Sequence, residues 1–342
     1  MLNAKFQLKR PRQFEICYED ISFDTEHVIV RPTHLSICNA DQRYYQGNRP
    51  EEVLRQKLPM CLIHEGIGKV VYDPTGTFKI GQTVVMIPNL PIESNPNIAE
   101  NYLRSSKFRG SSEDGFMQEY VQTVPDRLVA LPDGINPAVA AFTEIVSVSY
   151  HAISRFNEIA HSARDTIGIW GDGNLGFVTA LLFKKRFPEC KVVVFGINES
   201  KLNDFTFVDE TYKVNDIPDG FTVDHAFECV GGSPAPRAIN QIIDYIKPEG
   251  TISILGVTEE LAPLNTRMIL EKGLRVFGSS RSGREDFANL VKLYEDKPEV
   301  VSYLENIVGE QIRVKTIKDM AAAFEKDIHK LIGKTIMIWD AE

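Results

Sequence analysis

The stretch Asp165–Phe187, DTIGIWGDGNLGFVTALLFKKRF, decides the fold. It contains the pattern G-x-G-x-x-G at Gly171, Gly173 and Gly176, preceded by the apolar run TIGIW and followed by a helical pattern. This context is typical of a strand, a glycine turn and a helix that bind a dinucleotide pyrophosphate at the helix N-terminus. Gly171 makes the tight turn, Gly173 admits the pyrophosphate to the backbone, and Gly176 lets the helix pack on the strand. Asn174 and Leu175 open the helix. The alternative is a tight turn that binds no ligand.

The chain around this stretch falls into three zones. Residues 147–280 alternate strand-like runs such as KVVVFG and GTISILGV with helical segments, which predicts a doubly wound parallel sheet, a Rossmann domain. Residues 1–146 contain short strand-like runs bounded by Gly, Pro, Asp or Asn. Residues 281–342 are too few for a separate domain, so we expect them to fold back onto the first zone. The predicted class is α/β, with one β-rich domain and one Rossmann domain.

The end of the next strand indicates the type of coenzyme. An NAD site usually has an acidic residue there for the ribose 2′-hydroxyl, but KVVVFG ends in Gly196. Glycine leaves room for a 2′-phosphate, and Asn198, Ser200 and Lys201 follow, which favours NADP(H). The sequence does not show whether the side chain of Glu199 points toward the coenzyme. The alternative interpretation of Lys201 is an ordinary solvated helix residue that contacts no phosphate.

A second motif, CLIHEGIG at Cys61–Gly68, places His64 beside Glu65. Thiol, imidazole and carboxylate groups are good zinc ligands, and Cys38 and Glu144 supply a further thiol and carboxylate. Asp41 fits better as a partner that orients His64. Each residue alone has a plainer interpretation: Cys38 as a small buried side chain, Glu144 as a helix cap or surface residue.

These residues carry a resemblance to a family. SICNAD (Ser36–Asp41), IHEGIGKV (Ile63–Val70) and FTEIVSVSYHA (Phe142–Ala152) resemble the zinc-dependent medium-chain dehydrogenases, as does LEKGLRVFGSSRSGREDF (Leu270–Phe287). The order and spacing of these segments agree with the family over nearly the whole chain. The resemblance implies one catalytic zinc bound by Cys38, His64, Glu65 and Glu144, with the carboxylates binding directly or through water. It also implies that residues 1–146 and 281–342 form a GroES-like catalytic domain.

A narrower branch of the family implies the activity. SICNADQRYYQGNRPEEVLRQKLPMCLIHEG and DHAFECVGG resemble members that reduce D-ribulose 5-phosphate to D-ribitol 5-phosphate with NADPH. The product would feed, as CDP-ribitol, into teichoic acid or capsule synthesis. The resemblance also implies a homodimer and an association with the cytidylyltransferase of the same pathway. We expect the strand in GTISILGV, near the edge of the coenzyme domain, to form the dimer interface. The alternatives are another polyol dehydrogenase and a non-catalytic NADP-binding protein.

Two features depart from the family pattern. The loop Pro88–Gly115 has no cysteine, so we expect no structural zinc. Ala40 stands where relatives carry a Ser or Thr that relays protons. Alanine cannot relay a proton, so the candidates for proton transfer are water, Glu65, Tyr44 and Tyr45.

A phosphorylated substrate requires cations. We expect Arg43, Lys107 and Arg109 to be the first candidates for its phosphate, although each is more often a solvated surface charge. Arg49, Arg281 and Arg284 are further candidates.

Composition excludes several other classes of protein. The net charge of −9 without a basic stripe argues against nucleic acid as a partner. The sequence has no run of 18 apolar residues, so it predicts no membrane span. The polar N-terminus lacks the apolar core of a secretory signal. The five scattered cysteines fit reduced thiols better than disulfides. We therefore expect a cytoplasmic enzyme.

Overall fold

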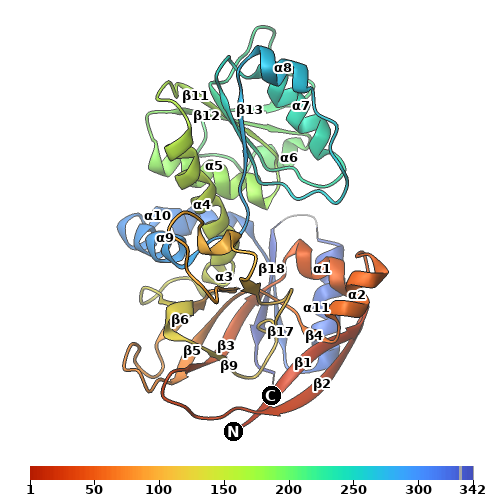
Figure 1. Cartoon of the computed structure of the whole chain (residues 1–342), viewed down its shortest axis with the longest axis vertical. Helices are drawn as coiled ribbons and strands as arrows, with labels where there is room; N and C mark the ends of the chain where they lie inside the picture. Colours follow the sequence, from red (N-terminus) through yellow and green to blue (C-terminus); the bar gives the residue numbers. More distant parts are fainter. Residues whose placement is uncertain (331–332, 342) are drawn as a thin grey trace. The chain divides into compact units, whose positions relative to one another are not determined.

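A computed structural model describes residues 1–330 and 333–341. It divides into two compact units (Figure 1). Unit 1 comprises Met1–Glu144 and Ser282–Glu342, and unit 2 comprises Ile145–Arg281. Unit 1 is therefore built from both ends of the chain, and unit 2 is inserted between them.

Unit 1 is rich in β-structure. Its larger sheet has the order β10-β6-β5-β3-β18-β17, with β9 also paired to β3; a smaller sheet has the order β2-β1-β4, and β7 pairs with β8. The C-terminal strand β18 is antiparallel to β3 and parallel to β17, so strands from both ends of the chain share the larger sheet. The strands are β1 (Leu2–Arg10), β2 (Gln13–Asp20), β3 (Val28–Ser36), β4 (Met60–Cys61), β5 (Glu65–Tyr72), β6 (Thr83–Met86), β7 (Asn89–Leu90), β8 (Lys107–Phe108), β9 (Val121–Thr123), β10 (Leu128–Ala130), β17 (Val308–Val314) and β18 (Lys334–Trp339).

Helices of unit 1 cover the core between its sheets. Tyr45 and Phe14 pack on Phe324 of α11, with ring centroids 4.7 and 5.5 Å from it. Helix α11 begins with a capping box, in which Thr316 and Asp319 satisfy each other's backbone N–H groups. The helices are α1 (Asn39–Tyr45), α2 (Glu51–Lys57), η1 (Glu100–Tyr102), η2 (Pro125–Arg127), α3 (Pro137–Ala140), α9 (Arg284–Asp296), α10 (Glu299–Leu304), η3 (Glu305–Ile307) and α11 (Ile317–Ile328). Helix α4 (Thr143–Ile159) begins in unit 1 and continues into unit 2.

Unit 2 is a parallel sheet in the order β13-β12-β11-β14-β15-β16. The order grows in both directions from β11, as in a doubly wound Rossmann fold. The strand in GTISILGV is β15, which lies one strand inside the edge that β16 forms. The strands are β11 (Thr166–Trp170), β12 (Lys191–Gly196), β13 (Glu210–Lys213), β14 (His225–Glu228), β15 (Thr251–Ile254) and β16 (Arg275–Gly278).

The helices of unit 2 are α5 (Asn174–Arg186), α6 (Glu199–Leu202), α7 (Ala235–Tyr245) and α8 (Thr266–Glu271). Helix α7 places Ala235, Ala238, Ile239, Ile242 and Ile243 on one face, at the three- and four-residue spacing of an amphipathic helix. That face packs against the sheet, and α8 lies beside α7 (Figure 1).

The long loop Pro88–Gly115 is held by ionic contacts. Buried Arg127 donates to Glu100 Oε1 at 2.7 Å and to the carbonyl of Asn89 at 3.1 Å. Glu100 Oε1 also accepts from the backbone N–H of Arg284 at 2.9 Å. These contacts fix a loop that has no cysteine.

A search of the described residues finds no helix with both the length and the apolar character that crossing a membrane requires.

Candidate metal centre and coenzyme site

Cys38 is positioned by the start of helix α1. It is the N-cap residue of this helix, and Asp41, at the third helical position, accepts a hydrogen bond from the Cys38 backbone N–H at 3.1 Å. A carboxylate in the first helical turn is favourable because it satisfies a free N–H group and faces the positive end of the helix dipole. The cap thus fixes both the thiol and the carboxylate.

The same carboxylate positions His64. Asp41 Oδ1 accepts from the backbone N–H of Ile63 at 3.0 Å and lies 3.4 Å from His64 Nδ1. Ile63 has a φ of +72°, a conformation that costs a β-branched residue of the order of 1–3 kcal/mol. The strained turn directs His64 inward, where Phe108 packs at a ring-centroid distance of 5.5 Å. Asp41 holds Nδ1, so the other ring nitrogen, Nε2, is available as a ligand.

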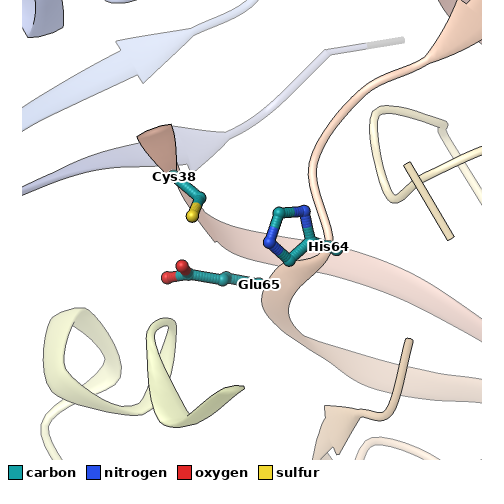
Figure 2. Close-up of side chains that lie close together, drawn as sticks. All are labelled: Cys38, His64 and Glu65. Carbon is teal, nitrogen blue, oxygen red and sulfur yellow. The ribbon is translucent and has the colours of Figure 1, made fainter. Parts of the chain in front are cut away.

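Cys38, His64 and Glu65 form one cluster. Their potential ligand atoms all lie within 4.8 Å of one another, although Cys38 is at the N-cap of α1, His64 in the loop before β5 and Glu65 at the start of β5. Figure 2 shows the three side chains converging. Glu65 is fully buried, and its Oε2 has no hydrogen-bond partner among the residues that the structure describes. A buried carboxylate oxygen without a partner, beside a thiol and an imidazole, fits a donor set for zinc.

Lys334 belongs to this site, and the sequence reasoning missed it. Its Nζ donates to Glu65 Oε1 at 2.8 Å, and its side chain is only 3% exposed. Burial lowers the pKa of Lys334, but the negative charges of Glu65 and Cys38 outweigh burial and raise the pKa above its ordinary value. The only signal was a lysine that opens the apolar run KTIMIW, which reads as a solvated strand end.

Glu144 and His64 are electrostatically linked to the cluster. Burial and the neighbouring Glu65 raise the pKa of Glu144 to about 7, against the lowering effects of His64 and Lys334. For His64, burial lowers the pKa, but Asp41 and Cys38 raise it well above its ordinary value. Glu144 stands at the second position of α4 and lies outside the group of three that could share a metal ion.

The candidate phosphate residues lie in different places. Lys107 pairs with Glu113, and Arg109 donates to the backbone carbonyls of Asp114 and Gln122. Phe108, between them, faces His64, so the alternation of a strand turns both cations away from the cluster. Arg43 lies on α1, five residues after Cys38, and close enough to Arg49 for the two charges to interact.

The glycine turn of unit 2 has the expected geometry. Gly171 has a φ of +132°, and a Cβ at Gly176 would lie 1.9 Å from the carbonyl oxygen of Gly171. A Cβ at Gly173 would meet no atom within 4 Å. The turn leads into α5, which begins at Asn174 and Leu175 with Gly173 as its N-cap residue. Gly171 and Gly176 are required by packing, whereas Gly173 faces open space.

The end of β12 differs from our expectation in one respect. The space above Gly196 is filled, because a Cβ there would lie 2.6 Å from the Cβ of Asp172 and 2.7 Å from its Oδ2. Asn198 caps α6 by accepting from the N–H of Ser200, and Glu199 points to Lys213 at 2.7 Å. Gly196 therefore does not leave an empty space for a phosphate.

Comparison with models of protein families identifies the family to which the chain belongs. Residues 24–133 match the model of the alcohol dehydrogenase GroES-like domain, and residues 188–296 match that of the zinc-binding dehydrogenases. The chain belongs to the zinc-binding dehydrogenase family.

Its relatives define a narrower group. The chain is 55% identical to ribulose-5-phosphate reductase of Bacillus spizizenii, covering 99% of this chain and 100% of the relative. It is 52% identical to ribulose-5-phosphate reductase 1 of Staphylococcus aureus, covering 99% of each. The structure superposes with a TM-score of 0.89 on S. aureus TarJ, solved in complex with NADPH, at 48% identity and 99% coverage of both chains.

Proposed function

We propose that the protein reduces D-ribulose 5-phosphate to D-ribitol 5-phosphate with NADPH, with the aid of one zinc ion. The observation that carries the proposal is the buried cluster Cys38, His64 and Glu65, in a chain that is 55% identical over its length to a ribulose-5-phosphate reductase. The glycine turn of unit 2 gives the coenzyme its pyrophosphate site.

The donor set fits zinc. A thiolate, an imidazole and a carboxylate are three protein ligands of a catalytic site, which keeps a further position open for substrate. Glu65 Oε2 would be the oxygen that holds the ion, directly or through water, because Lys334 binds Oε1 and Oε2 has no other partner among the described residues. When bound, zinc acts as a Lewis acid that polarises the substrate carbonyl.

The remaining residues set the charge and orientation of the site. Asp41 fixes the ring of His64 through Nδ1, which selects Nε2 as the ligand atom. Lys334 places an ammonium group 2.8 Å from the buried carboxyl group of Glu65 and so supplies its counterion. Glu144 adds a second buried carboxylate whose charge is felt by His64 and Glu65.

Arg43 and Arg49 are the residues that we assign to the substrate phosphate. Arg43 lies on α1, five residues after Cys38 and on the same face of the helix as Ala40. The guanidinium of Arg49 stacks on the ring of Tyr44 at 4.7 Å. Burial lowers the pKa of Arg43, and the positive charge of Arg49 lowers it further, so the two guanidinium groups lie close enough to interact. A phosphate dianion relieves that repulsion.

Further features of the proposal concern the environment of the enzyme. We place it in the cytoplasm, where its five free cysteines stay reduced. There it supplies ribitol 5-phosphate to a cytidylyltransferase for teichoic acid or capsule synthesis, with which it associates. It forms a homodimer through the edge strand β16, where Val276 is 38% exposed.

The test is the oxidation of NADPH with D-ribulose 5-phosphate, with unphosphorylated D-ribulose, with NADH, and after removal of zinc. We expect fast turnover only with the phosphate ester and NADPH, lost on chelation and restored by zinc. Equal rates with D-ribulose would contradict the substrate. Arg43→Gln should raise KM for the phosphate ester about 10- to 100-fold, as expected for a lost charge-assisted contact, and leave the slow reaction of D-ribulose unchanged.

A further inference from the structure

The coenzyme cavity of unit 2 carries one cation. The cavity has a volume of about 370 Å³ and lies beside the glycine turn. Its walls include Gly173, Gly196, Ile197, Val230, Arg237 and Gln241. Most of the lining is apolar, as suits an adenine ring, and Arg237 is the one lysine or arginine among the described residues that line it.

The end of β12 already holds a negative charge. Asp172 Oδ2 accepts hydrogen bonds from the backbone N–H groups of Ile197 and Asn198, both at 2.8 Å. These are the two N–H groups that follow the strand, where the ribose of a dinucleotide comes to lie. A 2′-phosphate cannot use them while Asp172 does, and the carboxylate repels a phosphate placed beside it. A chain that prefers NADPH therefore needs a cation elsewhere in the cavity.

The lysines near β12 are poorly suited to this role. Lys213 pairs with Glu199 at 2.7 Å. Lys201 is on α6 and does not line the cavity. Neither of these lysines offers the cavity a charge.

Arg237 is better placed than either lysine. It lies in the first turn of α7, where the helix dipole disfavours a cation by about 0.3–1 kcal/mol. It has no carboxylate partner among the described residues, and its hydrogen bond to Asn215 Oδ1 is long, at 3.3 Å. An exposed arginine in an unfavourable helix position, at the wall of an otherwise apolar coenzyme cavity, is explained by an anionic ligand.

We propose that Arg237 binds the 2′-phosphate of NADPH, and that Asp172 keeps this phosphate away from the N–H groups at the end of β12. Arg237 is thus a specificity-determining residue for the coenzyme. The proposal rests on the use of NADPH in the proposed function. It moves the 2′-phosphate from the β12–α6 turn, where sequence reasoning places it, to the start of α7.

The test measures binding of 2′,5′-ADP and 5′-AMP by calorimetry, which requires neither zinc nor substrate. Arg237→Gln should weaken 2′,5′-ADP about 10- to 100-fold and leave 5′-AMP within about 2-fold, because only the 2′-phosphate contact is lost. The matched control is Arg267→Gln, since Arg267 is an exposed arginine of the same unit that pairs with Glu271. It should change neither affinity.

A second variant tests the role of the carboxylate. Asp172→Asn keeps an acceptor for the N–H groups and removes the charge, so 2′,5′-ADP should bind about 3- to 10-fold more tightly. Weaker binding of 2′,5′-ADP to this variant would overturn the role of Asp172.

Three other outcomes contradict the proposal. If Arg237→Gln binds 2′,5′-ADP like the wild type while Lys201→Gln loses it, the phosphate lies at α6. If Arg237→Gln weakens both ligands equally, Arg237 only shapes the cavity. If the wild-type protein binds 2′,5′-ADP no better than 5′-AMP, the NADPH assignment itself fails, whatever the substrate assay shows.

Discussion

At the scale of single residues, the candidate metal site depends on buried charged groups that contact partners of opposite charge or hydrogen-bond donors. Asp41 serves three partners at once: the backbone N–H groups of Cys38 and Ile63 and the ring of His64. The motif around His64 and Glu65 was visible in the sequence because its members are close in the chain. Lys334 was not, because it lies 269 residues from the carboxylate that it contacts.

Lys334 gives the sharpest prediction at this scale. Lys334→Met leaves Glu65 buried without its cation and should destabilise the protein by about 3–5 kcal/mol. Urea unfolding with measured zinc content checks this. Lys326→Gln, which breaks an exposed pair with Glu310, should cost less than about 1 kcal/mol. Equal effects of the two variants would show that the buried pair has no special role.

At the scale of elements, the glycine turn and the strands of unit 2 follow from local patterns. The run TIGIW is β11 and the helical pattern after the turn is α5, as the sequence predicts. The position of Asp172 could not be predicted, because it depends on how the turn meets the end of β12. The spacing of hydrophobic residues predicts where helices and strands lie. It does not predict which side chain fills the space between two of these elements, because that depends on tertiary packing.

The two glycines of the turn should respond differently to alanine. Gly176→Ala forces a Cβ against the carbonyl of Gly171 and should destabilise unit 2 by about 1–3 kcal/mol. Gly173→Ala meets no atom and should leave stability unchanged, while its methyl group blocks the approach of the pyrophosphate and weakens NADPH. Thermal unfolding and NADPH titration of both variants separate the two effects. A loss of stability in Gly173→Ala would contradict the view that Gly176 serves packing and Gly173 serves access of the pyrophosphate.

Strand β14 contains a histidine that predicts a dependence on pH. His225 Nδ1 accepts from the N–H of Thr251 and Nε2 donates to the carbonyl of Ala163, both at 3.0 Å. Burial and the neighbouring His161 lower the pKa of His225 from 6.5 to about 4. The unfolded chain therefore takes up this proton near pH 6.5, whereas the folded chain does not until about pH 4.

Stability should consequently fall as the pH drops from about 6.5 toward 4, by about 3 kcal/mol from this residue. Urea unfolding at several pH values, with His225→Gln as comparison, isolates the contribution. The variant should lose stability at neutral pH but show a shallower decline below pH 6.5. Parallel curves for both proteins would exclude His225 as a source of the pH dependence.

At the scale of the whole molecule, each unit has its own hydrophobic core and its own ligand chemistry. Cys38, His64, Glu65, Asp41, Glu144 and Lys334 all belong to unit 1, and the glycine turn and its cavity belong to unit 2. The change from short β-runs to alternating strands and helices was enough to anticipate two such bodies from the sequence. The pairing of β18 with β3 was not predictable from periodicity, because register between distant strands depends on tertiary packing.

Removal of the metal should therefore abolish catalysis without affecting nucleotide binding. After dialysis against a chelator we expect turnover to be lost and the affinity for 2′,5′-ADP to stay within about 2-fold, since the described residues that line the cavity all belong to unit 2. Re-addition of zinc should restore turnover. A parallel loss of 2′,5′-ADP binding would show that the metal also supports unit 2.

The late position of Lys334 has a consequence for biosynthesis. A ribosome releases Cys38, His64 and Glu65 long before it makes the strand that carries the balancing ammonium group. Until β18 joins β3, the nascent chain exposes the edge of an unfinished sheet and leaves a carboxylate without its counterion. The inserted unit 2 is complete earlier, because all its strands lie between Thr166 and Gly278. Nascent chains that stop before Lys334 should thus bind nucleotide yet fail to retain zinc.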